Sequence, residues 1–242
     1  MGSLENFYKS YAKSSVSQFD QGTIDCFDYG SRYYICKKSI SNLPENYFSE
    51  QERVILELGC WNGKTLLYLA ESYGFSKAIG VDIGISDPGV RGKSEFIDYD
   101  LNNTWPFQDG SVDVLVGMMV LEHLFNPWFC FSEIERVLRH DGRAFINLPL
   151  VSNLKNRFRL LFGKLPETSV PYGVWQKEGH WDGFHLHYFT IKSIRDLADA
   201  ANMEIVGMEG VGKLKPLKDR FLSILAAEVS FELRKKKRPR NL

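Results

Sequence analysis

Short apolar runs alternate with amphipathic segments along the middle of the chain. Runs at 54–58, 77–81, 95–100, 112–117 and 143–149 have the length and composition of buried strands. Helical spacing of apolar positions follows at 65–72 and at 126–138, where Asn126-Pro127 is a favourable helix start and Asp141-Gly142 is the expected end. This alternation, with a period of roughly 20–30 residues, predicts an α/β fold with a doubly wound, mostly parallel sheet.

The flanking segments break this alternation. Residues 37–50 and 83–92, rich in Ser, Asn, Gly and Pro, read as a connector and a loop. A basic amphipathic helix is expected at 154–162, inside an irregular stretch at 150–189 that we interpret as a substrate-facing insertion. A helix at 191–201 capped by Thr190, and strands at 203–208 and 224–233, complete the pattern.

Two domain ranges follow. Residues 1–50 form an aromatic-rich N-terminal extension, which could be a lid over a ligand or a packed segment with no part in chemistry. Residues 51–242 form the main domain.

A glycine turn follows the first strand, in the sequence Glu57-Leu-Gly59-Cys-Trp-Asn-Gly63. Glycine lets the backbone approach a ligand, and the next helix directs unpaired N–H groups at the same place. Asp82 ends the second strand, where an acid suits the two hydroxyls of a ribose. The dinucleotide pattern GxGxxG is absent because Trp61 occupies its middle glycine position.

These motifs resemble those of the class I S-adenosylmethionine (SAM) dependent methyltransferases. The family pattern ExGxGxG is matched except at Trp61, and Asp100-Leu101 through Pro106-Phe107 and the Val120-to-His123 run resemble two further family passages. The resemblance spans roughly 50–235 and implies a Rossmann-like, seven-stranded sheet with an antiparallel final strand. It implies SAM as cofactor, S-adenosylhomocysteine as product, and cofactor contacts from Glu57, Gly59, Cys60, Gly63, Asp82, Ile83, Asp100, Leu101 and Met118.

Glu122 and His123 are the ionisable pair expected nearest the transferred methyl group, so they are the candidate catalytic residues. A histidine there could take a proton from an acceptor, or the pair could only hold the following helix and loop. His185 precedes Phe189-Thr190 in a passage that also resembles the family, and it either points into the active site or anchors the insertion. The spacing of His180, His185 and His187 matches no ligand pattern, so no metal ion is expected.

The composition and net charge bear on whether the protein binds nucleic acid. The 242 residues are 44% hydrophobic and 25% charged with a formal net charge of zero, which gives no overall field to attract nucleic acid. The basic run at 234–240 is read as a solvated terminus, although it could bind RNA, acidic lipid or an import receptor. Four cysteines without CxxC spacing are expected to be free thiols.

The chain has no expected signal peptide and no apolar run long enough to span a membrane, so a cytoplasmic enzyme is predicted. The expected acceptor is a small molecule or a lipid or glycan precursor. The alternatives are a non-catalytic methyltransferase-like module that acts through a partner protein, and a nicotinamide-dependent oxidoreductase. The missing GxGxxG counts against the oxidoreductase. The oligomeric state is not predicted.

Overall fold

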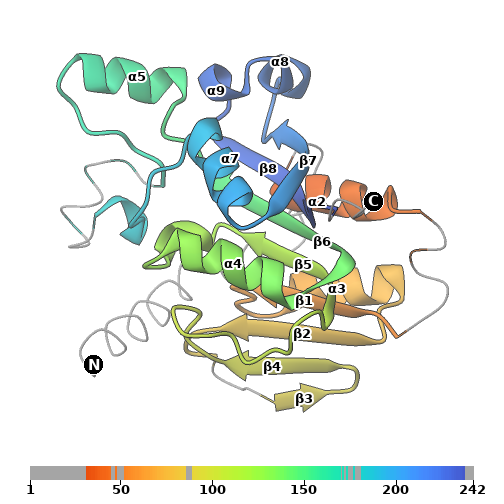
Figure 1. Ribbon diagram of the computed structural model, residues 1–242. Coiled ribbons are helices and arrows are strands. Elements are labelled where there is room, and N and C mark those ends of the chain that lie inside the picture. The colour runs from red at the N-terminus through yellow and green to blue at the C-terminus, as the bar shows by residue number, and fades with distance from the viewer. Residues whose placement is uncertain are drawn as a thin grey trace.

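The computed structural model describes residues 31–44, 47, 52–85, 89–169, 171, 173, 177 and 181–237, and its centre is one twisted sheet (Figure 1). The described strands pair in the order β3-β4-β2-β1-β5-β6-β8-β7. Their bounds are β1 Val54–Leu58, β2 Lys77–Asp82, β3 Gly89–Arg91, β4 Ser94–Asp98, β5 Val112–Met118, β6 Leu138–Pro149, β7 Met203–Gly210 and β8 Glu228–Lys235.

The pairing confirms the predicted mostly parallel, doubly wound sheet. Strands β4, β2, β1, β5 and β6 run parallel, whereas β8 is antiparallel to both β6 and β7. Among the described residues the sheet has one strand more than the seven expected, because three residues of the predicted loop at 83–92 form β3 at the edge. A two-residue turn led by Gly92, with φ +62°, joins β3 to β4. So short an edge strand has no apolar pattern to reveal it.

Helices cover both faces of the sheet (Figure 1). Their bounds are α2 Arg32–Ser41, α3 Lys64–Tyr73, α4 Pro127–Val137, α5 Leu154–Leu161, α7 Ile191–Ala200, α8 Lys215–Arg220 and α9 Leu222–Leu225, with short 3₁₀ turns η3 Leu121–His123 and η4 Asp182–Phe184. Alternate residues of β1 divide the core, since Ile55 packs with α2 and α3 and Leu56 packs with α4 and α7. A central parallel strand therefore needs apolar residues on both faces.

A buried carboxylate ties the central strands together at their N-terminal ends. Asp113 of β5 accepts the Val54 N–H at 2.8 Å and forms ion pairs with Arg53 at 3.2 Å and Arg139 at 3.0 Å. These partners explain an acid at 0% exposure in a strand that is otherwise apolar.

Several predicted boundaries were wrong. Residues 37–41 of the expected connector belong to α2, whose mixed aromatic and basic sequence has little helical periodicity. Helix α4 ends at Val137 instead of near Asp141, because Leu138 already pairs with Val112 before a register shift in β6. The last strand begins at Glu228, after the short helix α9. Residues 1–30 of the expected N-terminal extension lie outside the described residues.

Candidate active site

The glycine turn joins β1 to α3 and is built on left-handed backbone. Gly59 and Gly63 have φ angles of +64° and +71°. A Cβ atom on Gly59 would lie 2.3 Å from Val120 Cγ2, and one on Gly63 would lie 2.2 Å from Phe96 Cε1. Both glycines are therefore required by conformation and by space, and they leave the backbone open to a ligand.

Trp61 adopts the same kind of backbone at the position where the family pattern has glycine. Its φ angle is +46°, and its N–H donates to Asp82 Oδ2 at 2.7 Å. A non-glycine residue in this region stores roughly 1–3 kcal/mol of strain, which the surrounding structure must offset. The hydrogen bond to Asp82 holds Trp61 in that conformation and fixes the turn against the end of β2.

Two acids lie beside the turn, Glu57 in β1 and Asp82 at the end of β2. Asp82 also accepts the Ile83 N–H through Oδ1 at 2.7 Å, and burial raises its pKa while these two N–H groups lower it. Glu57 is 3% exposed, and its Oε2 has no hydrogen-bond partner among the described residues. Burial and the nearby Asp82 charge raise the pKa of Glu57 to about 8. An unpartnered buried carboxylate oxygen beside an open backbone turn suits a cationic ligand, as the sulfonium and ammonium groups of SAM are.

The loop at 99–111 carries Asp100 and Leu101. Asn102 donates its backbone and side-chain N–H groups to Asp100 Oδ1 at 2.9 and 2.8 Å, so both of these hydrogen bonds use the same carboxylate oxygen. Leu101 is buried, and its carbonyl accepts the Trp105 indole N–H at 3.1 Å. Asn102 Oδ1 also accepts the Phe125 N–H at 2.7 Å, which joins this loop to the segment after η3.

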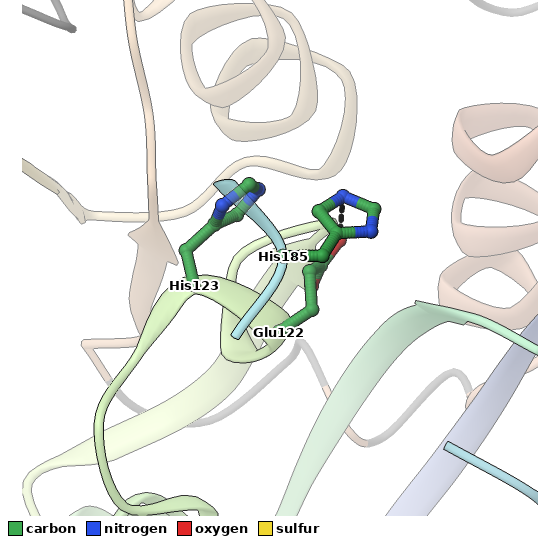
Figure 2. Close-up of side chains that lie close together, drawn as sticks. All are labelled: Glu122, His123 and His185. Atoms are coloured by element: carbon green, nitrogen blue, oxygen red, sulfur yellow. Dashed lines mark ion pairs between the residues drawn. The ribbon is translucent and has the colours of Figure 1, made fainter. Parts of the chain in front are cut away.

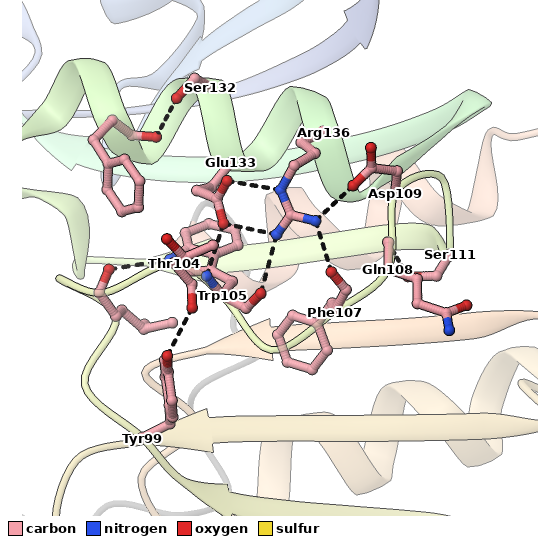
Figure 3. Close-up of polar contacts among 12 residues, drawn as sticks. Tyr99, Thr104, Trp105, Phe107, Gln108, Asp109, Ser111, Ser132, Glu133 and Arg136 are labelled. Carbon is pink, nitrogen blue, oxygen red and sulfur yellow. Dashed lines mark hydrogen bonds and ion pairs between the residues drawn. The ribbon is translucent and has the colours of Figure 1, made fainter.

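An ion-pair network fixes this loop on α4 (Figure 3). Glu133 accepts the Trp105 N–H at 2.7 Å and pairs with the guanidinium of Arg136 at 2.7 Å. Arg136 in turn donates to the carbonyls of Phe107 and Trp105 at 2.7 and 3.0 Å. The loop that positions Asp100 is therefore held by charged side chains of a helix that packs on the core.

The sheet order brings most of the predicted cofactor residues to one edge. Strands β4, β2, β1 and β5 are neighbours, and their parallel carboxyl ends carry Asp98, Asp82, the glycine turn and Met118 respectively. Cys60 is buried in that turn, and its backbone N–H donates to the Val81 carbonyl at 3.1 Å. Asp98 was missed by the sequence reasoning, although it pairs with Asp82 in register and accepts the Gly84 N–H at 2.8 Å. Two acids ending adjacent parallel strands could have revealed it.

A second group of polar side chains lies just beyond β5. Glu122, His123 and His185 point toward one another (Figure 2), and their ligand-capable atoms all lie within 4.8 Å of one another. His185 Nε2 is 3.8 Å from Glu122 Oε1, and the two imidazole centroids are 4.8 Å apart. The Leu186 N–H donates to the Glu122 carbonyl at 2.8 Å, which joins the insertion to η3.

Burial shifts the pKa of each of the three side chains in the direction that favours its uncharged form. It raises the pKa of Glu122 to about 8, and it lowers the pKa of His123 to about 4. Burial and the neighbouring His123 lower the pKa of His185 to about 3. Both imidazoles are therefore neutral at pH 7 and can act as electron-pair donors.

His180, His185 and His187, the histidines whose spacing was considered above, are not brought together in the part of the chain that the structure describes. His187 Nε2 lies 3.2 Å from the Phe125 carbonyl, and His180 lies outside the described residues. Asp182, the acid that accompanies these histidines in the sequence, and Thr168, which the sequence did not single out, support His185. Thr168 Oγ1 lies 2.7 Å from both His185 Nδ1 and Asp182 Oδ2.

None of the described helices has the length and apolar composition needed to cross a membrane. Cys36, Cys60 and Cys130 are free thiols and are buried, whereas Cys26 lies outside the described residues.

Comparison with known proteins matches the family that the sequence resembles. A family model described as "Methyltransferase domain" matches residues 56–146. The chain is 21% identical over 210 residues to a malonyl-[acyl-carrier protein] O-methyltransferase of Marinomonas sp. (strain MWYL1), covering 83% of this chain and 70% of that protein.

Solved structures share the fold. A Burkholderia thailandensis 1,6-didemethyltoxoflavin-N1-methyltransferase, solved with bound 1,6-didemethyltoxoflavin and S-adenosylhomocysteine, has a TM-score of 0.58 at 16% identity. The alignment covers 96% of this chain and 91% of that chain. A SAM-dependent methyltransferase from Aquifex aeolicus has a TM-score of 0.55 at 13% identity, with 91% and 97% coverage.

The family match and the curated relative do not favour a non-catalytic module. Together with the glycine turn and the acids at the strand ends, they identify the cofactor as SAM. The chain belongs to the class I SAM-dependent methyltransferases.

Proposed function

We propose that this enzyme methylates a small-molecule acceptor, or a lipid or glycan precursor, at the junction between the glycine turn and the Glu122–His123–His185 group. The observation that carries the proposal is the position of this group directly after β5, whose neighbour β1 ends in the turn. Ligands of open α/β sheets bind beyond the carboxyl ends of the strands.

The cofactor residues divide by chemistry. Each oxygen of Asp82 accepts one backbone N–H and keeps a second lone pair for a ribose hydroxyl. Asp100 Oδ2 suits the adenine amino group, with Leu101, Ile83 and Met118 as the apolar surroundings. Glu57 Oε2 suits the ammonium group of SAM, and Gly59, Cys60 and Gly63 supply the close backbone.

Bound SAM supplies a methyl group that its sulfonium already activates. The chain therefore has to align the acceptor with the methyl carbon, exclude water and remove a proton where the acceptor is a hydroxyl. Glu122 and His123 are the proposed catalytic residues for that last task, because a neutral imidazole can accept a proton. His185 is proposed to orient them.

A cavity of about 430 Å³ lies between the start of α5, the segment around Thr168 and α9. That volume is within the usual range for ligand pockets. Thr168 connects it to the proposed catalytic group, because Thr168 Oγ1 lies 2.7 Å from His185 Nδ1, but Glu122, His123 and His185 do not line the cavity.

The test begins with calorimetric titration of the full chain with SAM, S-adenosylhomocysteine and NAD. We expect binding of both adenosyl ligands, loss of that binding in Asp82→Ala, and no binding of NAD. A screen of hydroxyl and amine acceptors with SAM would follow, using release of S-adenosylhomocysteine as the readout. Binding of NAD alone would refute the proposed site.

A further inference from the structure

We infer that Glu122, His123 and His185 bind one divalent transition-metal ion, of which Zn²⁺ is the representative. The inference deepens the proposed function, on which it rests for the ion's role toward an acceptor. In the metal-bound site the ion, and not Glu122 or His123 as a base, would make the acceptor proton easier to remove. It departs from the expectation of no metal ion, which concerned a different set of histidines.

The hydrogen bonds of His185 direct one nitrogen of its ring toward Glu122. Thr168 Oγ1 donates to Asp182, so it accepts a hydrogen bond from His185 Nδ1. That assignment leaves the ring's electron pair on Nε2, which faces Glu122 Oε1 at 3.8 Å. This separation is too long for a hydrogen bond between the two atoms, and it is compatible with both atoms binding one cation.

Glu122 supplies the second observation. Its side chain is fully buried, and neither Oε1 nor Oε2 has a hydrogen-bond partner among the described residues. Arg32 is the basic residue whose charge reaches it, but the Arg32 guanidinium is paired with Glu228 at 3.0 Å. A buried carboxylate without a partner is strongly destabilising, and a bound cation would remove that cost.

In both histidines, Nδ1 makes a hydrogen bond to the surrounding protein, as the non-ligating nitrogen of a metal-bound histidine usually does. His123 Nδ1 lies 3.2 Å from the Phe184 carbonyl, which can only accept, so its Nε2 is the electron-pair donor. His185 is supported by Thr168 and, through it, by Asp182, which also accepts the N–H groups of Thr168 and Ser169 at 2.9 and 3.0 Å. Such second contacts fix the tautomer and the direction of a ligating imidazole.

The backbone before His185 is strained in a way that supports a site. Asp182, Gly183 and Phe184 have φ angles of +39°, +66° and +65°. Two non-glycine residues in left-handed conformation within one turn are unfavourable, and such strain gathers at binding sites. Here the turn delivers both the Phe184 carbonyl and the His185 ring to the group.

The ligand set indicates the class of ion and its role. Two imidazoles and one carboxylate suit Zn²⁺ and its neighbours better than Mg²⁺ or Ca²⁺, and three protein ligands leave a position open for water or substrate. An acceptor oxygen in that position would be held beyond β5 and would lose its proton more easily. The structure therefore favours a hydroxyl acceptor over an amine.

The test uses the full chain, freed of metal with a chelator and titrated with Co²⁺, whose visible absorption reports imidazole ligation. We expect a single bound ion that Zn²⁺ displaces. Glu122→Gln and His185→Gln should weaken Co²⁺ binding by more than about 100-fold, and Thr168→Val by about 10–100-fold. His187→Gln is the matched control and should bind as the parent does.

The outcomes separate the two proposals. No Co²⁺ binding by the parent chain, or unchanged binding in Glu122→Gln, would overturn the metal site. SAM titration of the metal-free chain tests the cofactor site independently, because no proposed SAM contact is a metal ligand. If Glu122→Gln fails to fold, the parent titration and the Thr168→Val variant still decide the question.

Discussion

The Trp61 N–H donates to Asp82 Oδ2 at 2.7 Å. This hydrogen bond joins Trp61, which stands where the family pattern has glycine, to the acid proposed to bind the ribose. Asp82→Asn replaces one carboxylate oxygen by an N–H₂ donor, so Trp61 or Ile83 loses its acceptor. We expect SAM affinity to fall by about tenfold or more, since one lost charged hydrogen bond is worth about 1.5–3 kcal/mol. Calorimetry measures the affinity, and unchanged binding would show that Asp82 does not contact the cofactor.

Gly63 and Gly74 offer a matched pair of substitutions. Both have left-handed φ angles, +71° and +66°, but only a Cβ on Gly63 would collide with Phe96. Gly74→Ala should lower the free energy of unfolding by about 1–2 kcal/mol through backbone strain alone. Gly63→Ala should lower it further, by an additional 1–3 kcal/mol of the order found for overpacking.

Denaturant titration of both variants provides the measurement. Equal destabilisation by the two substitutions would show that Phe96 moves aside freely and that the turn is not sterically limited.

Glu57 predicts a pH dependence of stability. Its pKa is raised to about 8 in the folded chain, first by burial and then by the Asp82 charge. The folded state therefore binds more protons than the unfolded state between the unfolded pKa, about 4.3, and about 8. The stabilisation is fully present below that window and is lost as pH rises through it.

Glu57→Gln removes this titration while keeping the shape of the side chain. We expect the variant to be more stable than the parent at pH 8 by several kcal/mol at most, on the order of 1.4 kcal/mol per unit of pKa shift. The difference should disappear near pH 4. Glu122 titrates in the same window, so only the difference between parent and variant is informative; a constant difference across the range would contradict the assignment.

Arg136 forms an ion pair with a buried acid and another with an exposed acid, and the two pairs should contribute differently to the free energy of unfolding. Glu133 is 7% exposed in its side chain and also accepts the Trp105 N–H, whereas Asp109 is 81% exposed. Glu133→Ala should destabilise the chain by about 1–3 kcal/mol because it leaves the buried Trp105 N–H without its acceptor and removes one of the partners of Arg136. Asp109→Ala should change stability by less than about 1 kcal/mol.

Thermal unfolding of the two variants, with SAM titration, checks this prediction. We also expect Glu133→Ala to weaken SAM binding, because the loop it holds carries Asp100 and Leu101. A lower unfolding temperature with unchanged SAM affinity would show that the ion-pair network does not position the cofactor residues.

Where strong apolar runs meet glycine or capping residues, the sequence alone located the elements. Residues 54–58 are β1 as predicted, and Thr190 caps α7 through its hydrogen bond with the Ser193 N–H. The order of the glycine turn, Asp82 and Asp100 along the chain also predicted one edge of the sheet, because parallel strands joined by helices place their carboxyl ends together. Their roles toward SAM stay predictions.

Local sequence could not determine contacts between segments distant in the chain. Nothing near Trp61 reveals that a tryptophan holds a glycine-like backbone, since Asp82 from another strand stabilises it. His185 is more than 60 residues from Glu122, and its orientation depends on Thr168, Asp182 and a strained turn. Hydrophobic periodicity thus determined the scaffold, whereas tertiary packing decided which polar groups meet, because those contacts depend on where the insertion folds back onto the end of β5.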